Sequence, residues 1–455
     1  MQGGVLRLVE KTDVLIIGGG PAGLLTAIFS KRYYPDKRVV LIRREKTVLV
    51  PCAIPYIPNT LGSVDKNIIP DQLLEKEGVE IVIDKVIKVN REERKVFTAK
   101  GSEWVYDKLV LATGSEPVKL SVPGSDLGNI FYIHRNKEYM EKLKNAIDEA
   151  NDVVIVGGGF IGVELADEIA KMGKHVTIVE LLPHCMMRNF DLEFCEIAET
   201  ELRKLGVNIM TGVRTTAFEG DNKVKAVSIS DGRKIDADVV VVSIGMKPNV
   251  ELAKQMGLKI GESGGIVVDE YMRTSDPNIF AVGDCAEKID FFTRRPVAMM
   301  LASIATAEAR VAGANLYELN VVKRIAGTIG IFSTVVGDVC FGVAGLTEAE
   351  AKKNGFEVVI GEAITRDKHP GTMPGARDIR VKLVFSRHGG YLIGGQVAGG
   401  PSIGEIINLL GLAIQDNLTA IELATMQYGT HPKLTAAPLV YPVVVAAESA
   451  LRKIE

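Results

Sequence analysis

Residues 13–23 read Asp13-Val-Leu-Ile-Ile-Gly-Gly-Gly-Pro-Ala-Gly23, an apolar run that breaks into glycines and then opens a helical stretch. Residues 152–162 repeat this design as Asp152-Val-Val-Ile-Val-Gly-Gly-Gly-Phe-Ile-Gly162. A second apolar run follows each of them about one helix later, at 39–42 and at 176–179. Strand, glycine turn, helix and strand in this order predict the βαβ unit of a doubly wound parallel sheet. The predicted fold class is therefore α/β, with two dinucleotide-binding modules.

Both turns carry glycines in the spacing G-x-G-x-x-G of Rossmann-like modules. The first glycine permits a tight turn, the second lets the backbone approach a pyrophosphate, and the third packs the helix against the strand. The helix N-terminus then offers N–H donors and a partial positive charge to the phosphates. Two such turns in full strand–helix context predict two bound dinucleotides. The six glycines are Gly18, Gly20, Gly23, Gly157, Gly159 and Gly162.

The pattern of the chain changes from about Arg324. Glycine, threonine and valine alternate through residues 326–337, and apolar and polar residues alternate again through 379–385. Such alternation predicts half-buried antiparallel strands. A helical stretch follows at 403–415, and another lies near the C-terminus. We expect a C-terminal α+β domain.

The composition excludes several classes of protein. The chain has 455 residues and a formal net charge of −3, without the basic surplus typical of a nucleic-acid-binding protein. No run reaches the ~18 apolar residues that a membrane-spanning helix needs. The five cysteines stand singly and lack metal-ligand spacing, which fits a reducing compartment better than a disulfide framework. We expect a cytoplasmic protein with no membrane or nucleic-acid partner and no metal site.

The residue that ends the second strand of each module bears on ribose recognition. In the second module it is Glu180, whose carboxylate would accept a hydrogen bond from a ribose 2′-hydroxyl and repel a 2′-phosphate. Leu181 and Leu182 follow and supply no cation, so the sequence favours NADH over NADPH. The first module has Arg43 and Arg44 at the corresponding place, which leaves open how that ribose is held.

A single cysteine lies close to the first module. Cys52 stands in Leu49-Val-Pro-Cys-Ala-Ile-Pro-Tyr56, shortly after the second strand. A thiolate beside a dinucleotide can act as the nucleophile of thiol–disulfide exchange. A buried structural thiol is the alternative, and without further context the residues alone favour it.

The chain as a whole resembles the flavin-dependent pyridine nucleotide–disulfide oxidoreductases. It is most similar to their single-cysteine branch, which includes coenzyme A disulfide reductases, NADH oxidases and peroxidases, and persulfide or polysulfide reductases. The resemblance covers nearly the whole chain, and its motifs in this order are very specific. They are Gly18–Gly23, Pro51-Cys-Ala-Ile-Pro-Tyr56, Ala112-Thr-Gly114, Gly157–Glu164, Gly245-Met-Lys-Pro-Asn249, Ala281-Val-Gly-Asp284 and Gly345-Leu-Thr-Glu348.

This resemblance implies a glutathione reductase-like architecture with a C-terminal α+β dimerisation domain. It implies FAD in the first module, NAD(P)H in the second and a homodimer built by the last domain. The implied domains are an FAD-binding domain in two parts, 1–118 and 247–323, an NAD(P)H-binding domain at 119–246 and an interface domain at 324–455.

The resemblance also assigns roles to residues. Cys52 is implied to face the flavin as the redox-active thiol, and Asp284 to hold the FAD ribityl chain. Two-cysteine relatives carry the partner cysteine five residues on, where this chain has Ile57. The implied chemistry therefore uses one protein thiol and passes through a mixed disulfide, persulfide or sulfenic acid.

Two departures from the family pattern bear on the substrate. Pro21 stands where the peroxidase and water-forming oxidase group carries a histidine, which argues against dedicated peroxide chemistry. Thr372 and Met373 stand where coenzyme A disulfide reductases carry paired tyrosines, which argues against close adherence to that activity.

A segment near the C-terminus, Tyr428-Gly-Thr-His-Pro-Lys-Leu-Thr435, resembles the segment that two-cysteine reductases present from the partner subunit as acid–base catalyst. Imidazole titrates near neutrality, so His431 is a candidate to protonate a leaving thiolate. The acidic residue that orients it in relatives is Ala436 here. A histidine in an interface loop is the alternative of equal weight, and Tyr428 is a candidate to line the substrate channel.

The predicted function is an FAD-dependent NAD(P)H oxidoreductase that acts on small disulfides, persulfides or polysulfides, coenzyme A-linked ones included. The alternatives are an NADH oxidase that reduces O₂ and a flavin redox sensor with little turnover. The predicted catalytic residues are Cys52, His431 and Tyr428. The predicted cofactor-binding residues are Gly18, Gly20, Pro21, Ala22, Gly23, Arg43, Arg44, Val86, Ala112, Thr113, Gly114, Gly157, Gly159, Phe160, Ile161, Gly162, Glu164, Glu180, Gly245, Gly283 and Asp284.

Overall fold

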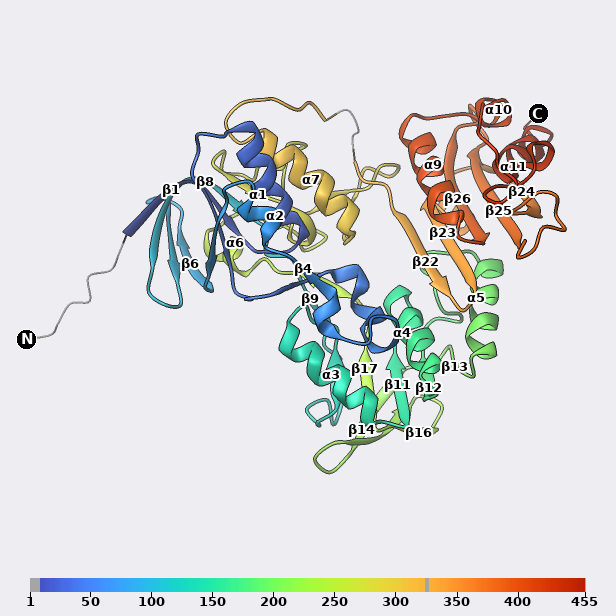
Figure 1. Cartoon of the computed structure of the whole chain (residues 1–455), viewed down its shortest axis with the longest axis horizontal. Coiled ribbons are helices and arrows are strands. Elements are labelled where there is room, and N and C mark those ends of the chain that lie inside the picture. Colours follow the sequence, from blue (N-terminus) through green and yellow to red (C-terminus); the bar gives the residue numbers. More distant parts are fainter. Residues whose placement is uncertain (1–8, 324–326, 455) are drawn as a thin grey trace, which may run out of the picture.

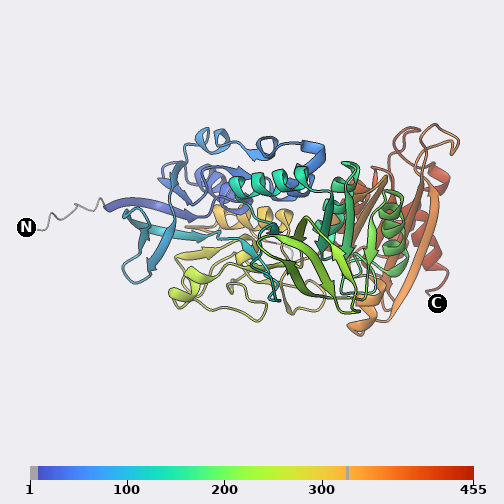
Figure 2. The same cartoon turned by 90° about the horizontal axis from the view of Figure 1, so that it is seen from below.

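Three sheet-centred units make up the structure, a computed structural model that describes residues 9–323 and 327–454. The first and third units lie at opposite ends of an elongated molecule, and the second lies between them (Figures 1 and 2). We call them the FAD module, the NAD module and the interface domain, after the expectations above. The expected boundary at 323/324 falls beside residues 324–326, which lie outside the described residues.

The FAD module is built on a seven-stranded sheet with the order β5-β2-β1-β8-β7-β6, in which β19 also pairs with β8. Five strands are parallel, and β6 and β7 extend the sheet antiparallel. All five residues of β2 are buried, as expected for a parallel strand that is covered on both faces. The strands are β1 (Val9–Ile17), β2 (Val39–Arg43), β5 (Glu80–Ile83), β6 (Val86–Asn90), β7 (Lys95–Thr98), β8 (Glu103–Leu111) and β19 (Ile279–Ala281).

Helices α1 and α7 pack against each other beside this sheet (Figure 1). α1 begins at Pro21, directly after Gly20. Proline suits a first helical position because its missing N–H would have no partner there and its backbone is already near the helical conformation. The remaining elements of the module are α1 (Pro21–Tyr33), α2 (Gln72–Glu75), α6 (Glu251–Gln255), α7 (Ala302–Ala314), β3 (Val48–Leu49), β4 (Ile68–Ile69), β20 (Lys288–Ile289) and β21 (Pro296–Val297).

The NAD module contains a parallel sheet with the order β10-β17-β11-β12-β13 and a small antiparallel sheet, β14-β15-β16. A two-stranded ladder of β9 and β18 joins it to the FAD module. The strands are β9 (Ser115–Pro117), β10 (Ile130–Tyr132), β11 (Asp152–Val156), β12 (His175–Val179), β13 (Asn208–Met210), β14 (Thr215–Gly220), β15 (Val224–Ile229), β16 (Lys234–Asp236), β17 (Val239–Val242) and β18 (Met246–Pro248). The helices are α3 (Lys137–Glu149), α4 (Phe160–Lys171) and α5 (Leu192–Lys204).

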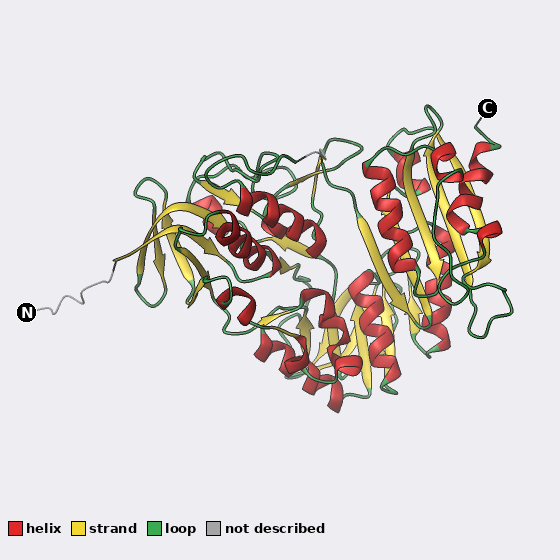
Figure 3. Cartoon of the chain, turned by 45° about the horizontal axis from the view of Figure 1, so that its top comes forward, coloured by secondary structure: helices red, strands yellow, loops and turns green. Residues whose placement is uncertain are grey.

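The interface domain is an antiparallel sheet with the order β22-β23-β26-β25-β24 and helices packed on it (Figure 3). The helical stretch predicted at 403–415 is α9, whose buried residues Ile403, Ile406 and Ile407 recur at helical spacing. The strands are β22 (Ile331–Val336), β23 (Val339–Gly345), β24 (Val358–Arg366), β25 (Asp378–Ser386) and β26 (Leu392–Gly399). The helices are α8 (Glu348–Lys353), α9 (Ile403–Gln415), α10 (Ala420–Ala424) and α11 (Pro442–Leu451).

The expectation of a half-buried strand at 379–385 is wrong, because β25 and its neighbour β26 are buried on both faces of the sheet. Every residue of β26 is buried, and so is Lys382 in β25. One face of the sheet packs on α9 and α11, and the other meets the NAD module. Lys382 is buried because its ammonium pairs with Asp191 and Glu193, beside the start of α5.

One hydrophobic core runs from the NAD module into the interface domain. It joins Ile155 and Phe194 of the first to Phe341 and Val343 of the second, and it includes Ile54, two residues after Cys52. Separate cores lie on the two faces of the FAD sheet and under α9 and α11. The NAD module and the interface domain are thus packed as one body.

Candidate functional site

The two predicted glycine turns have nearly the same geometry. Gly18 has a φ of 117°, and a Cβ there would lie 2.1 Å from the carbonyl oxygen of Ala112. Gly157 has a φ of 109°, and its Cβ would lie 2.7 Å from the carbonyl oxygen of Ser243. A side chain is excluded at both positions by backbone conformation and by space. Each turn therefore brings two strand ends of its sheet close together.

The second glycine of each turn faces open space. A Cβ on Gly20 or on Gly159 would meet no atom within 4 Å. These two residues are the N-caps of α1 and α4, and no side chain caps either helix. Backbone N–H groups at both helix starts are thus available to an anion, which is the arrangement that holds a dinucleotide pyrophosphate.

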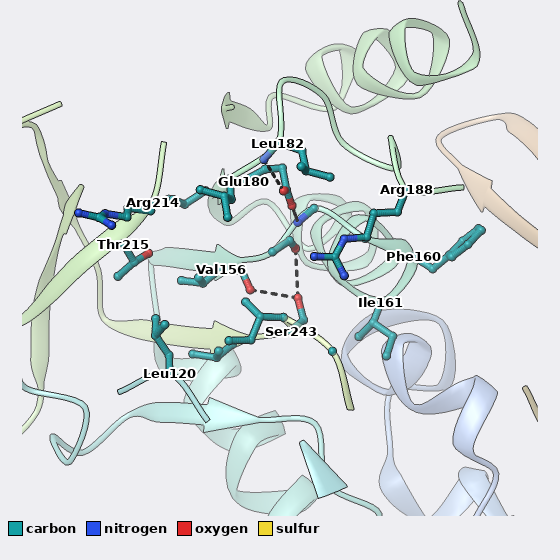
Figure 4. Close-up of a pocket in the computed structure, with 18 of the residues that line it drawn as sticks. Leu120, Val156, Phe160, Ile161, Glu180, Leu182, Arg188, Arg214, Thr215 and Ser243 are labelled. Carbon is teal, nitrogen blue, oxygen red and sulfur yellow. Dashed lines mark hydrogen bonds between the residues drawn. The ribbon is translucent and has the colours of Figure 1, made fainter. Parts of the chain in front are cut away.

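Glu180 lies directly behind the turn of the NAD module. Its Oε2 accepts a hydrogen bond of 2.5 Å from the backbone N–H of Gly158, and its Oε1 accepts one of 2.7 Å from that of Leu182. The carboxylate is held at the edge of a cleft of about 740 Å³ that the glycine turn also lines. Figure 4 shows this cleft with Glu180 beside the turn. The position suits a carboxylate that receives a ribose hydroxyl.

The same cleft holds two arginines that the sequence reasoning missed. Arg188 points into the cleft from the loop after β12, whereas Arg214 points away from it (Figure 4). Within the described residues, the Arg188 guanidinium has no hydrogen-bond or ion-pair partner. Arg188 lies eight residues after Glu180 along the chain and reaches the cleft because its loop folds back over the turn. The sequence alone does not show this fold of the loop.

The FAD module differs at the corresponding point. Arg43 is 3% exposed and lies beneath Gly19, where a Cβ would come within 2.5 Å of the Arg43 Cδ. Its guanidinium makes two hydrogen bonds, of 2.7 and 2.6 Å, to the carboxylate of Asp71. It donates two more to the carbonyl oxygens of Glu45 and Lys46. Arg43 thus places a positive charge behind the turn, and its guanidinium is committed to protein partners. Its neighbour, the exposed Arg44, pairs with Glu45.

Asp284 lies in the short 3₁₀ turn Gly283–Cys285 that follows β19. Its Oδ2 accepts hydrogen bonds of 2.7 Å from both the Ser115 hydroxyl and the Arg135 guanidinium. The adjacent backbone N–H of Gly283 donates to Glu308, which forms a buried ion pair with Lys288. The sequence did not indicate that Ser115, Arg135, Glu308 and Lys288 gather here, because they come from separate parts of the chain.

Cys52 lies in a helical segment that we call the Cys52 segment, made of a 3₁₀ turn (Pro51–Tyr56) and a π turn (Ile57–Leu61). This segment packs against α4 of the NAD module, so it joins the two modules (Figure 1). All five cysteines are free, and Cys52 alone among them is exposed. Burial raises the pKa of the Cys52 thiol, and the negative charge of Glu164 raises it further. Arg135 acts in the opposite direction.

Helix α4 presents three carboxylates to its surroundings. The Thr334 hydroxyl donates a hydrogen bond of 2.6 Å to Glu164 Oε1. Glu168 accepts hydrogen bonds from the backbone N–H and the hydroxyl of Thr60 in the Cys52 segment. Asp167 accepts one from the backbone N–H of Gly337 and pairs with Lys171. The helix that starts at the NAD turn therefore contacts both the Cys52 segment and the interface domain.

The two C-terminal candidates lie away from Cys52 within one chain. Tyr428 donates a hydrogen bond of 2.7 Å to the carbonyl of Pro438 and stacks on Tyr441. His431 is exposed, in the loop between α10 and α11, which lie at the end of the molecule remote from α4 (Figure 1). Their predicted catalytic roles stay predictions.

The remaining predicted residues fall into three groups. Val86 packs in a core of the FAD module, so its side chain is not available to a ligand. Phe160 stacks on Phe332 of β22 at 5.2 Å, at the entrance to the cleft that Ile161 and Gly245 line. The residues gathered around the turn of the FAD module are Gly18, Gly20, Pro21, Ala22, Gly23, Ala112, Thr113, Gly114 and Gly283.

Among the described residues, no group of three or more His, Cys, Asp or Glu side chains is placed to hold a metal ion. No helix in the described part of the chain is both long enough and apolar enough to cross a bilayer.

Comparison with known proteins gives consistent findings. Residues 12–309 match the family model described as pyridine nucleotide-disulphide oxidoreductase, and residues 331–439 match the model of its dimerisation domain. The chain is 35% identical to an NADH oxidase of Methanocaldococcus jannaschii over 97% of its own length and 99% of the relative. It is also 35% identical to an NAD(P)H coenzyme A polysulfide/persulfide reductase of Pyrococcus horikoshii, over 86% and 88% of the two chains.

A solved structure supports the same relationship. The NAD-dependent persulfide reductase of A. fulgidus superimposes with a TM-score of 0.91 and 31% identity. The match covers 97% of this chain and 83% of that one. The predicted fold class, with its two dinucleotide modules and C-terminal dimerisation domain, is confirmed by these matches.

Proposed function

Because the chain belongs to the pyridine nucleotide-disulphide oxidoreductase family, an FAD- and NAD(P)H-dependent family of oxidoreductases, we propose that it reduces sulfur–sulfur bonds in small molecules with Cys52 as its redox-active thiol. One observation carries the proposal. Cys52 is the exposed cysteine of the five, and it stands on the segment that joins the two dinucleotide modules. A single thiol at that junction suits an enzyme that passes electrons from one dinucleotide to a sulfur substrate through the other.

The residues present fit both cofactors. In the FAD module, Gly20 leaves room for a pyrophosphate at the start of α1, and Asp284 is held at the far end of the module. In the NAD module, Gly159 and the cleft beside Glu180 make the equivalent arrangement. The chemistry that bound FAD supplies is two-electron transfer between the nicotinamide and sulfur. The protein binds, orients and shields the reactants.

We place NADH ahead of NADPH as the coenzyme. Both oxygens of Glu180 are held by backbone N–H groups, so the carboxylate is fixed in position beside the expected ribose. A 2′-phosphate there would meet a negative charge at short range. Arg188 opposes this effect because its positive charge lies in the same cleft. The preference for NADH is therefore expected to be moderate.

The proposed sulfur chemistry uses one protein thiol. The Cys52 thiolate attacks one sulfur of a substrate R–S–S–R′, which forms a Cys52–S–S–R bond and releases R′–S⁻. Two electrons from NADH then cleave the mixed disulfide to the Cys52 thiolate and R–S⁻. The overall reaction, NADH + H⁺ + RSSR′ → NAD⁺ + RSH + R′SH, balances in atoms and electrons. For a persulfide, R′ is hydrogen and the second product is H₂S.

The relatives named above support a persulfide or polysulfide as R–S–S–R′, with a coenzyme A-linked form among the candidates. The test is NADH consumption under anaerobic conditions by the FAD-loaded enzyme, with coenzyme A disulfide, coenzyme A persulfide and polysulfide as separate acceptors. Cys52→Ser is expected to lose at least about 10³-fold in rate, because the nucleophile is removed. Cys340→Ser is the matched control, since Cys340 is half-buried in β23 and far from this chemistry along the chain. A Cys52→Ser enzyme as active as the wild type would refute the proposal.

An NADH oxidase is the second candidate, because the Methanocaldococcus jannaschii relative that spans nearly the whole chain carries that name. The same assay repeated in air separates the two. Fast turnover with oxygen alone would assign Cys52 a supporting role. Negligible NADH consumption with every acceptor, oxygen included, would favour a flavin redox sensor.

We further propose a homodimer in the cytoplasm. The interface domain exposes large apolar side chains such as Leu439, which is 93% exposed, and Leu434, which is 66% exposed. Both lie in the loop that carries His431, so a partner chain that covers them brings His431 toward a second site. The four-part division at 118, 246 and 323 is proposed as the domain organisation of each chain.

A further inference from the structure

A buried ion pair lies next to the turn that carries Asp284. Lys288 is the first residue of β20 and Glu308 lies on α7, and the two residues are 4% and 6% exposed. The ammonium of Lys288 lies 2.9 Å from Oε1 of Glu308 and 3.0 Å from Oε2. Two charges that lose their hydration need further hydrogen bonds to offset that cost. The other partners of the two side chains therefore show what the pair holds.

Both polar backbone groups of Gly283 are bound by this pair. Lys288 Nζ donates a hydrogen bond of 2.7 Å to the carbonyl oxygen of Gly283. Glu308 Oε2 accepts one of 2.8 Å from the N–H of the same residue. Lys288 Nζ also donates, at 2.9 Å, to the carbonyl oxygen of Ala286. The three hydrogens of the ammonium thus have three acceptors, two of which are the carbonyls at the start of the Gly283–Cys285 turn and just after its end.

Gly283 is a position where the backbone needs such support. It has a φ of 75°, and a Cβ there would lie 2.8 Å from the Cβ of Ala22. The conformation and the close approach both require glycine, which is also the residue with the greatest backbone freedom. Ala22 is the second residue of α1, and Gly20, the N-cap of this helix, faces open space. The turn therefore packs against the helix start that suits the FAD pyrophosphate.

The turn is held from two directions. Helix α7 packs against α1 and brings Glu308 to the turn from one side. From the other side, the hydroxyl of Ser115 and the guanidinium of Arg135 donate to the side chain of Asp284, the residue after Gly283. Burial raises the pKa of Glu308, whereas Lys288 and the N–H of Gly283 act in the opposite direction. The carboxylate of Glu308 thus depends on the same contacts that hold the turn.

We propose that Lys288 and Glu308 are positioning residues for FAD. By binding the N–H and the carbonyl of Gly283, they hold the Gly283–Cys285 turn against the start of α1 and keep the phosphate-binding surface of the FAD module formed before the cofactor binds. A preformed site loses less conformational freedom on binding. The proposal rests on the binding of FAD by this module and not on the acceptor that the enzyme reduces, so turnover is not needed to test it.

The test compares FAD affinity with stability in the full-length enzyme. The Kd for FAD is measured by equilibrium dialysis, and the urea midpoint of unfolding is measured at saturating FAD. Lys288→Met removes two hydrogen bonds to the turn and leaves Glu308 buried without its cation. Glu308→Leu removes the acceptor of the Gly283 N–H. Each variant is expected to raise the Kd for FAD about 10- to 100-fold and to lower the urea midpoint.

The double variant Lys288→Met/Glu308→Leu separates a positioning role from a purely structural one. It leaves neither charge of the pair in the core, so its urea midpoint should exceed those of both single variants. Its Kd for FAD is expected to stay at least about tenfold above that of the wild type, because the hydrogen bonds from the pair to the turn are still missing. A double variant that binds FAD within about twofold of the wild type would overturn the proposal. This comparison remains possible if a single variant does not fold.

Two further variants distinguish the hydrogen bonds from charge and from stability. Glu308→Gln keeps an oxygen that can accept the Gly283 N–H, so its Kd for FAD is expected to lie within about threefold of the wild type. A Kd as high as that of Glu308→Leu would assign the effect to charge and overturn the proposal. Lys382→Met is the matched control, because it breaks another buried pair, with Asp191, outside the FAD module. It should lower the urea midpoint and leave the Kd unchanged, and an equal rise of the Kd in this control would also overturn the proposal.

Discussion

Replacement of Glu180 by glutamine tests how the NAD module selects its coenzyme. In the structure, both carboxylate oxygens accept backbone N–H groups, those of Gly158 and Leu182. A glutamine side chain has one acceptor oxygen, so its NH₂ group must face one of these two N–H donors. The substitution therefore removes the negative charge and at the same time loses one hydrogen bond that orients the glycine turn.

The expected magnitude follows from these two losses. A hydrogen bond to a charged group is worth about 1.5–3 kcal/mol, which corresponds to a decrease of about 10- to 100-fold in kcat/KM with NADH. With NADPH, the same loss is offset because the repulsion between the carboxylate and the 2′-phosphate disappears. The ratio of kcat/KM for NADH to that for NADPH is therefore expected to fall by about 10- to 100-fold.

The assay compares initial anaerobic rates with the two coenzymes and one sulfur acceptor. Glu219→Gln is the matched control, because Glu219 is an acid of the same module that pairs with Lys234 on its surface. It should leave the ratio unchanged. Arg188→Ala is expected to move the ratio the other way, since it removes the cation from the cleft. A Glu180→Gln ratio within about twofold of the wild type would refute the assignment of coenzyme choice to this carboxylate.

Three further predictions concern the architecture. Gly18→Ala should yield protein without flavin absorbance at purification, because its Cβ would lie 2.1 Å from the Ala112 carbonyl oxygen. Phe341→Ala should lower the free energy of unfolding by about 3–5 kcal/mol in urea titrations, since Phe341 is fully buried in the core shared by two units. Lys382→Met should lower that free energy by about 3–5 kcal/mol at neutral pH, because it leaves the Asp191 carboxylate buried without its cation. Burial raises the pKa of Asp191, but the hydrogen bonds to its carboxylate lower this pKa by more. The charged Asp191 carboxylate therefore stabilises the folded protein above its unfolded pKa of about 3.9. This contribution is lost as the pH falls through the lower pKa that Asp191 has in the folded protein. Urea titrations at several acidic pH values should accordingly show the difference between Lys382→Met and wild type shrinking.

The sequence was most informative where a single local pattern determines the structure. The spacing of glycines after an apolar strand predicted both turns, because no other residue fits at Gly18 or Gly157. The period of apolar residues predicted α9 at residues 403–415, since one face of the helix must be buried. Such features depend on residues that are neighbours along the chain.

Features that join distant segments were not predictable from the chain alone. Lys382 reads as the polar side of a half-exposed strand, and only the packing of the NAD module on the sheet shows why it is buried. Thr334 is one of many threonines, and its hydrogen bond to Glu164 spans 170 residues. Arg43 stands where the sequence pattern expects an acidic residue that holds the ribose. Its bidentate pairing with Asp71 can be recognised only in the three-dimensional structure.

The contacts that α4 makes with β22 bear on how relatives of this protein can be recombined. Thr334 and Gly337, which lie on β22 and in the turn after it, both bind carboxylates of α4. A chimera that takes its C-terminal third from another enzyme would therefore replace groups that hold α4 of the NAD module, and not only the surface proposed to join two copies. A breakpoint near residue 330 would therefore replace the groups that bind α4 together with the domain proposed to form the dimer. A fusion that preserves this chain's activity has to carry β22 along with α4.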